Sequence, residues 1–215
     1  MIQNKYKRSV TQVLDYSIPP QLAQWFKNNS KAKCESIGNE TKRIGTLVDT
    51  LVQQDISDGG YVPPEQDPQA INCLNGWEKL KKEHPEFVPS VKAMQIELIH
   101  EDIGGHPDFD CQETPDVWGI TDLKCTSGIR FKNYIQCAKY AKMLMRLGNR
   151  KFPSFIRIIR LQRDSDQYEW SEIRDPKMIQ YFMDLFDHYL AIYDSEIFLK
   201  EYFLQQAEDQ LLGDF

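Results

Sequence analysis

Three polar residues near the middle of the chain are spaced so that they can act on one chemical group. Asp122 and Lys124 lie two residues apart in the segment GITDLKCTS, and Asp108 lies fourteen residues earlier in GHPDF. Residues two apart on a β-strand point to the same face, roughly 7 Å apart along the chain. A tight turn between two strands would bring Asp108 beside them. We therefore expect Asp108, Asp122 and Lys124 to form one site.

This set of side chains suits the activation of water beside a phosphate group. Mg²⁺ takes oxygen ligands, mainly carboxylates and water, so Asp108 and Asp122 are predicted to hold one or two Mg²⁺ or Mn²⁺ ions. A metal-bound water is a strong nucleophile, and a nearby cation stabilises the charge that develops on phosphate oxygens. Lys124 is predicted to orient that water and to stabilise that charge. The pattern indicates hydrolysis of phosphodiester bonds without a covalent enzyme intermediate.

The distribution of charge favours a polyanion as partner more than the total charge does. The chain of 215 residues has a net charge of −6, which by itself argues against nucleic acid. Residues 123–163, however, include eleven Lys or Arg and no Asp or Glu, whereas residues 175–215 include nine acids and two Lys. Segregated charge of this kind is typical of a polyanion-binding surface, although two solvated faces would give the same pattern.

The elements that must position these residues follow from hydrophobic periodicity and from turn-forming residues. Helices are predicted at residues 9–16, from Pro20 through Phe26, at 41–54, 70–84 and 132–147, and from about Asp175 onward. Strands are predicted at residues 91–100, 106–111, 117–125, 155–162 and 168–173. Loops or turns are predicted at residues 27–40 and 58–69, at Gly104-Gly105 and at 112–116, so that the first three strands would form an antiparallel meander.

This order of elements indicates a mixed α/β fold with a central sheet flanked by helices. We expect a single domain over residues 1–215, with a mainly helical N-terminal part (1–85), a catalytic sheet and helix (91–175) and a C-terminal helix (176–215). No apolar run approaches the roughly 18 residues of a membrane span, and the first twenty residues lack a secretory apolar core. We expect an intracellular, cytoplasmic protein with no membrane partner, although the basic N-terminal segment leaves a mitochondrial location open.

The five cysteines are expected to be small apolar residues of the core. Their number is odd, their spacing is irregular and no two form a C-x-x-C pair. A disulfide framework or a zinc ribbon is therefore not predicted. The cysteines are Cys34, Cys73, Cys111, Cys125 and Cys137.

The central motifs resemble the PD-(D/E)XK nuclease superfamily. The Pro-Asp pair at 107–108 followed by D-x-K at 122–124 has the form of its core motif. Gln136-x-x-x-Tyr140 on the next predicted helix is similar to the QxxxY element of the RecB-like branch. GHPDF also resembles that branch's G-x-x-D-x turn, and DLKCTS resembles its D-x-K-T-S strand. The resemblance implies a restriction-endonuclease-like core with a mixed central sheet, and a metal-dependent deoxyribonuclease activity.

Two upstream segments extend the resemblance towards the N-terminus. SVTQVL at 9–14 and GTLVD at 45–49 are similar to segments of the mitochondrial genome maintenance exonucleases and related phage exonucleases. This similarity implies an exonuclease that acts on single strands or DNA ends, in DNA repair or replication. A site-specific endonuclease is the alternative within the enzyme class, and a non-catalytic nucleic-acid-binding module that retains the fold is the alternative outside it. The intact Asp–Asp–Lys set favours an enzyme.

Two further carboxylates are candidate metal ligands because of the resemblance. Glu97 lies eleven residues before Asp108, and a Glu at a similar place in this branch lies near the metal. The alternative is a solvent-facing strand carboxylate. Asp49 stands where the family has His, and an all-oxygen site would favour Mg²⁺ more than a site with imidazole would. The alternative for Asp49 is an ordinary exposed helix residue.

The predicted helix at 132–147 carries the remaining candidates. Gln136 and Tyr140 are four residues apart and share a helix face; the family role is to support the site or to contact the nucleic-acid backbone, and a buried polar pair is the alternative. Lys139, Lys142 and Arg146 form a basic stripe that suits phosphate contacts, although a solvated face would look the same.

An iron–sulfur cluster is not predicted. Some relatives of this branch hold such a cluster with one upstream Cys and three near the C-terminus. In this chain no Cys follows Cys137, so the expected cofactor is Mg²⁺ or Mn²⁺ alone.

Overall fold

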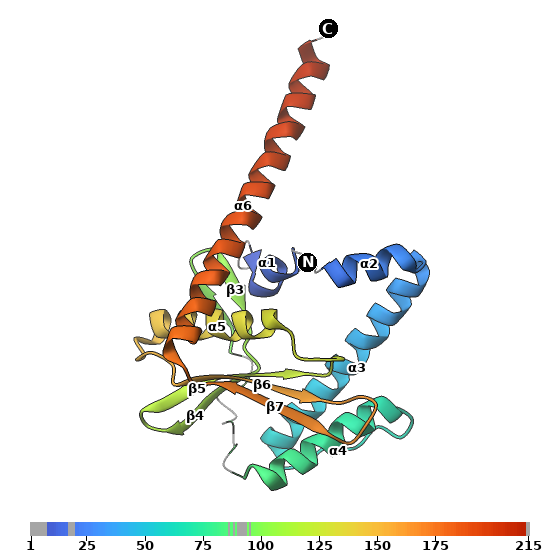
Figure 1. Cartoon of the computed structure of the whole chain (residues 1–215), viewed down its shortest axis with the longest axis vertical. Coiled ribbons are helices and arrows are strands. Elements are labelled where there is room, and N and C mark those ends of the chain that lie inside the picture. The colour runs from blue at the N-terminus through green and yellow to red at the C-terminus, as the bar shows by residue number, and fades with distance from the viewer. Residues whose placement is uncertain are drawn as a thin grey trace.

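Helices cover both faces of a four-stranded sheet, and a smaller sheet lies beside it (Figure 1). The computed structural model describes residues 8–16, 20–85, 87, 89, 94 and 96–213. The described elements are, in chain order, β1 (Arg8–Ser9), α1 (Val10–Asp15), α2 (Pro20–Asn28), α3 (Lys31–Asp58), α4 (Pro68–Glu83), β2 (Leu98–His100), β3 (Ile103–Gly105), β4 (Phe109–Thr114), β5 (Val117–Lys124), α5 (Phe131–Gly148), β6 (Phe155–Leu161), β7 (Tyr168–Ile173) and α6 (Pro176–Gly213).

The larger sheet has the strand order β4-β5-β6-β7. β5 pairs with β4 in antiparallel and with β6 in parallel orientation, and β7 is antiparallel to β6. A parallel pair needs a long crossover connection, which α5 provides between β5 and β6. The smaller sheet has the order β1-β3-β2, with β1 parallel and β2 antiparallel to β3. The fold is therefore mixed α/β with central mixed pairing, as the sequence predicts.

Several predicted segments differ in the structure. The predicted three-strand meander is present only in part. β4 and β5 form a hairpin, and Met94 of the predicted first strand makes a single antiparallel bridge with Phe109 of β4. β2, however, pairs with β3 in the other sheet. The predicted turn at Gly104-Gly105 is also wrong, because both residues lie in β3. The chain turns before β3, at Glu101 and Asp102, and Glu101 has a φ of 56°. The predicted strand 91–100 is described as a strand only over Leu98–His100, and residues 91–93 and 95 lie outside the described residues.

The predicted loop at 27–40 is wrong as well. Residues from Lys31 onward belong to α3, a single helix of 28 residues. Ser30 accepts a hydrogen bond from the backbone N–H of Lys33 and caps the start, and Gly59 ends the helix in the left-handed conformation with φ of 75°. The polar composition of residues 31–40 reflects their exposure, since most of them face solvent. A solvated helix and a loop have similar compositions, so the pattern favoured the wrong one.

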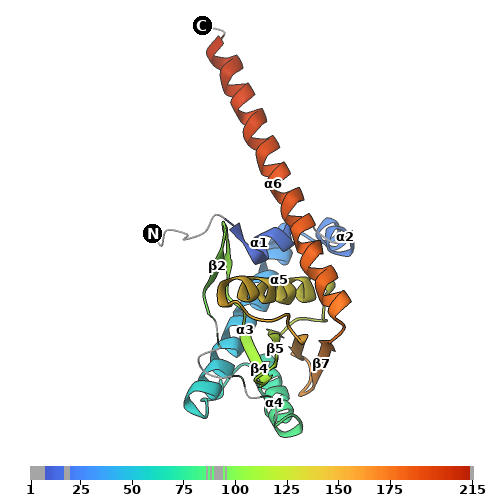
Figure 2. The ribbon, with the colours of Figure 1, turned by 90° about the vertical axis from the view of Figure 1, so that its left-hand side faces the viewer.

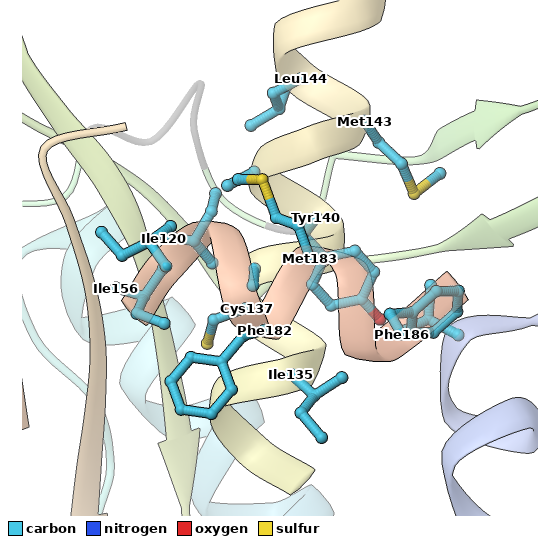
Figure 3. Close-up of a cluster of buried hydrophobic side chains, with 14 of the residues drawn as sticks. Ile120, Ile135, Cys137, Tyr140, Met143, Leu144, Ile156, Phe182, Met183 and Phe186 are labelled. Atoms are coloured by element: carbon cyan, nitrogen blue, oxygen red, sulfur yellow. The ribbon is translucent and has the colours of Figure 1, made fainter. Parts of the chain in front are cut away.

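Two apolar clusters pack against opposite faces of the larger sheet. Side chains alternate along a strand, so Ile156 and Ile158 of β6 join the cluster with α1, α5 and α6, whereas Phe155 and Ile159 join the cluster with α3 and α4. Figures 1 and 2 show α5 and α6 on one side of the sheet and α3 and α4 on the other. Figure 3 shows the first cluster, in which Phe182 and other side chains of α6 meet side chains of α5 and of the sheet.

The last helix extends well beyond the body of the fold. α6 has 38 residues, and its first part packs through Ile179, Phe182, Met183 and Phe186. Its later part projects away past α1 (Figures 1 and 2). None of the described helices is long and apolar enough to cross a membrane.

The close approach of β5 and β6 at Gly119 gives a first prediction. A Cβ atom at Gly119 would lie 2.2 Å from the carbonyl oxygen of Phe155, which belongs to rigid sheet backbone. We expect Gly119→Ala to lower the free energy of unfolding by roughly 1–3 kcal/mol. Urea unfolding measures this change. The control is Gly45→Ala in α3, where an added Cβ meets nothing within 4 Å and should raise stability by about 0.5–1 kcal/mol. Equal effects of the two substitutions would contradict the prediction.

Candidate active site

The three residues predicted to act together are brought together by the start of β4 and the end of β5. Lys124 Nζ lies 2.6 Å from Asp122 Oδ2. Asp108 directly precedes β4, and its Oδ2 accepts a hydrogen bond of 2.7 Å from the backbone N–H of Leu123. Asp122 and Lys124 lie two residues apart on the face of β5 that α5 covers, the same face as Ile120. The hairpin thus places both carboxylates and the ammonium group around one point.

The carboxylate of Asp122 is unusually buried for a charged group. Its relative exposure is 1%. Lys124 contacts one of its oxygens, and no other group in the described part of the chain donates a hydrogen bond to either oxygen. Burial raises the pKa of Asp122 to about 7; the Asp108 carboxylate adds to this increase, and the Lys124 ammonium opposes it. A carboxylate with so few donors has room for a cation as a further partner.

The ammonium group of Lys124 is held in its charged form. Burial alone would lower the pKa of Lys124, but the Asp122 and Asp108 carboxylates outweigh burial and raise it. Lys124 is therefore a positive charge at neutral pH, and it is unsuited to the role of a general base.

Helix α5 covers the face of the sheet on which the site lies. Tyr140 is buried, and burial raises the pKa of its hydroxyl, while a hydrogen bond with Gln136 and the Lys124 ammonium lower it. The Asp122 and Asp108 carboxylates act on the same hydroxyl, so Tyr140 lies within their field. The predicted sharing of one helix face by Gln136 and Tyr140 therefore holds.

Gly105 has a different role from the turn that its sequence predicts. A Cβ atom at Gly105 would lie 2.7 Å from the hydroxyl oxygen of Tyr140. The glycine lets β3 pack directly on the Tyr140 ring. Three residues later the chain reaches Asp108, so this contact between β3 and α5 helps to set the position of Asp108 just before β4.

The two further carboxylates come from other elements, the segment before β2 and the helix α3. Glu97 is exposed and directly precedes β2 in the smaller sheet. Asp49 lies on α3 and accepts a hydrogen bond of 2.8 Å from Gln53 Nε2. It also adds to the increase in the pKa of Cys125, which a hydrogen bond with Cys73 and burial mainly cause. Within the part of the chain that the structure describes, no group of three or more His, Cys, Asp or Glu side chains is arranged to hold a metal ion.

The basic stripe on α5 is largely engaged by α6. Lys139 is 5% exposed, and its Nζ lies 4.7 Å from the centre of the Phe186 ring. Lys142 Nζ lies 2.5 Å from Asp187 Oδ2. Only Arg146 of the three is exposed. The stripe is thus not an open solvated face, because α6 packs over the first two residues.

A cleft that the sequence did not reveal begins two residues beyond Lys124. It has a volume of about 610 Å³ and lies between α3 and the ends of β5 and β6. Arg160 of β6 donates from Nε to the backbone oxygen of Thr126 at 2.8 Å, and Arg163 donates to Thr41 Oγ1 at 3.1 Å. Arg160 is the register partner of Lys124, and only the parallel pairing of β5 and β6 reveals that relation.

All five cysteines are free thiols and all are buried, as the sequence predicts for small apolar residues. Cys137 lies on α5 and donates to the backbone oxygen of Arg157 at 3.8 Å. Burial raises its pKa, and the Asp122 carboxylate adds to the increase. The Cys137 thiol is therefore uncharged, and it lies on the helix that covers the site.

The chain was compared with known proteins. No family model and no curated protein matches it. Among solved structures it is similar to an alkaline exonuclease (LHK-Exo) from Laribacter hongkongensis, with 14% identity, a TM-score of 0.40, and coverage of 94% of this chain and 93% of that chain. A likeness of this degree assigns no family, so the function has to be argued from the residues of the site.

The electrostatic balance at Asp122 gives a second prediction. In the metal-free protein, Asp108→Asn should lower the pKa of Asp122 below about 7, because it removes the negative charge that disfavours ionisation. Lys124→Met should raise it, because it removes the ammonium that favours ionisation. A pH titration of the Asp122 carboxyl carbon by NMR measures both changes. The same direction of change in the two variants would contradict the described arrangement.

Proposed function

We propose that the protein is a metal-dependent DNA nuclease that hydrolyses phosphodiester bonds with a metal-activated water. The observation that carries this proposal is the buried carboxylate of Asp122, which has Lys124 as its one close partner and Asp108 beside it. Burying a carboxylate with so few donors is costly. A divalent cation would supply the missing interaction, and two carboxylates with a protonated lysine suit phosphate chemistry.

The donor set fits Mg²⁺ or Mn²⁺. These ions prefer oxygen ligands. Asp122 offers a carboxylate from β5, and Asp108 offers one from the position just before β4. When bound, the metal would lower the pKa of a coordinated water and neutralise charge on the phosphate. Glu97 and Asp49 stay proposed as additional ligands, because the resemblance suggests both.

Each residue of the site has a distinct task in this mechanism. Asp108 and Asp122 would hold the cation, Asp122 in its ionised form. Lys124 keeps its proton, so it orients the attacking water and stabilises the negative charge that grows on the phosphate oxygens. Tyr140 packs α5 against β3 at Gly105, and Gln136 forms a hydrogen bond with the Tyr140 hydroxyl.

The proposed substrate is DNA, bound as a single strand or at an end. Support comes from the basic stretch of residues 123–163 and from the cleft at the ends of β5 and β6. Its lining includes Arg160, Arg163, Thr126 and Ser127, which can contact phosphates, and also Glu40 and Asp164. The exonuclease activity is supported by the upstream segments that resemble exonucleases. Experiment must distinguish exonuclease activity from two alternatives, a site-specific endonuclease and a binding module without turnover.

Removal of the lysine charge or of one carboxylate gives the third prediction. With Mg²⁺ or Mn²⁺ and labelled DNA, Lys124→Met and Asp122→Asn should each lower the cleavage rate by about 10²–10³-fold or more, since each removes electrostatic stabilisation of the transition state. EDTA should abolish cleavage. The matched control is Lys31→Met, which removes a lysine outside the basic stretch; its ion pair with Glu35 is exposed and contributes little, so it should keep the wild-type rate.

Two results would reject this mechanism. One is cleavage that persists in EDTA, and the other is cleavage at the wild-type rate by Lys124→Met. Binding of DNA with no cleavage in any metal would instead indicate a module that keeps the fold without turnover.

A comparison of linear and circular substrates gives the fourth prediction. We expect end-labelled linear single-stranded DNA to be degraded while closed circular single strands stay intact, because an exonuclease requires an end. Gel electrophoresis of both substrates in the same reaction measures this difference. Cutting of the circles would show an endonuclease and would leave the assigned residues unchanged.

A further inference from the structure

A second polar pocket lies on another face of α5. It has a volume of about 460 Å³, within the range of roughly 300–1,000 Å³ typical of ligand sites. It lies between α5, α6 and the turn after β2. The charged or polar side chains that line it are His100, Glu101, Lys139, Lys142, Arg146 and Asp187. Lys139 precedes Tyr140 by one residue and so points about 100° away from it around the helix, which separates this pocket from the candidate active site.

The feature that distinguishes the pocket is a buried lysine. Lys139 is 5% exposed. Its ammonium lies 4.7 Å from the centre of the Phe186 ring, and it has no hydrogen-bond acceptor or ion-pair partner in the part of the chain that the structure describes. Burial lowers the pKa of Lys139, and Lys142 also lowers it, while Asp187 and Glu101 act in the opposite direction. The side chain is largely buried, but its Nζ opens onto the pocket and has no protein acceptor among the described residues, so an anionic group placed here would stabilise the ammonium.

The other charges of the pocket leave an excess of positive charge. Asp187 is already paired with Lys142 at 2.5 Å. Glu101 is then the remaining carboxylate, whereas Lys139 and Arg146 are both cations, and His100 lies beside them. A set of cations with few carboxylates cannot hold a metal ion. It suits an anion with several acceptor oxygens, which can accept hydrogen bonds from an ammonium and a guanidinium together.

We propose that this pocket binds a phosphate group. Lys139 would donate to one phosphate oxygen from its buried position, and Arg146 and Lys142 would hold the others from the rim. The phosphate can belong to a free mononucleotide or to a phosphodiester of a bound strand, and both offer the same oxygens. The pocket goes beyond the proposed nuclease site, and phosphate binding here requires no catalysis.

The experiment measures phosphate binding in a protein that also carries Asp122→Asn, so that no substrate is degraded. Inorganic phosphate, a deoxynucleoside monophosphate and a short single-stranded oligonucleotide are each titrated by calorimetry, at an ionic strength matched with chloride. Lys139→Met should weaken binding by about tenfold to a hundredfold, since it removes a charge-assisted hydrogen bond. The methionine should also raise the melting temperature without phosphate, because it replaces an unpaired buried charge with an apolar chain.

Two further variants make the test decisive. Lys132→Met removes another lysine of α5, which lies outside the pocket and pairs with Asp15; it should leave the binding of inorganic phosphate and of the mononucleotide unchanged. Arg146→Gln changes an exposed rim residue and keeps the proposal testable if the Lys139 variant fails to fold; it should weaken binding several-fold.

The pattern across the three ligands identifies the source of the phosphate. Weaker binding of inorganic phosphate and mononucleotide in the Lys139 or Arg146 variant indicates a site for free nucleotides. Weaker binding of the oligonucleotide alone indicates a contact with the strand. The proposal would be overturned if both pocket variants bound all three ligands with the affinity of the Asp122→Asn parent. Retained nuclease activity in the Lys139 variant would not affect it, so this result is separable from a failure of the proposed function.

Discussion

The burial of one carboxylate, that of Asp122, is the constraint on which the rest of the structure depends. A charged group can be 1% exposed only if its surroundings are rigid and supply charge, and here Lys124 supplies it from the same strand. Burial of this strand requires partners on both edges, which β4 and β6 provide, and a helix over its face, which α5 provides. Because β5 and β6 are parallel, the crossover through α5 is obligatory. The same connection therefore covers the carboxylate and completes the sheet.

The two sheets meet at this site. β3 packs on Tyr140 through Gly105, where no side chain intervenes, and the chain then passes directly to Asp108 and into β4. Asp108 is tied in turn to the backbone of Leu123. The position of one carboxylate is thus set by a contact between the smaller sheet and α5, and the position of the other is set within the larger sheet. A change in the packing of either sheet would alter the distance between the two carboxylates.

Two largely buried lysines show that the surroundings of a lysine side chain determine the direction in which its pKa shifts. Lys124 lies between two carboxylates, which outweigh burial and raise its pKa. Lys139 faces an aromatic ring and a second lysine, so burial dominates and its pKa is lowered. The first lysine keeps a permanent charge for a reaction at phosphate. The second is a charge without an acceptor, which is the physical reason to expect an anion beside it. Helix α5 accounts for the burial of both lysines. It covers Lys124 with the face that contacts the sheet, and α6 covers Lys139 on another of its faces.

The sequence by itself determined the features that depend on neighbours along the chain. The strand at 168–173 was predicted with its observed bounds, and Asp122 and Lys124 share a face because strand residues two apart always do. The tertiary structure decided what depends on distant partners. Polar residues 31–40 form a helix, Gly105 packs against an aromatic ring, β5 lies parallel to β6, and Lys139 is buried by α6. Periodicity records which side of an element is apolar. It does not record which element covers that side, because this choice is made by packing between segments far apart in sequence.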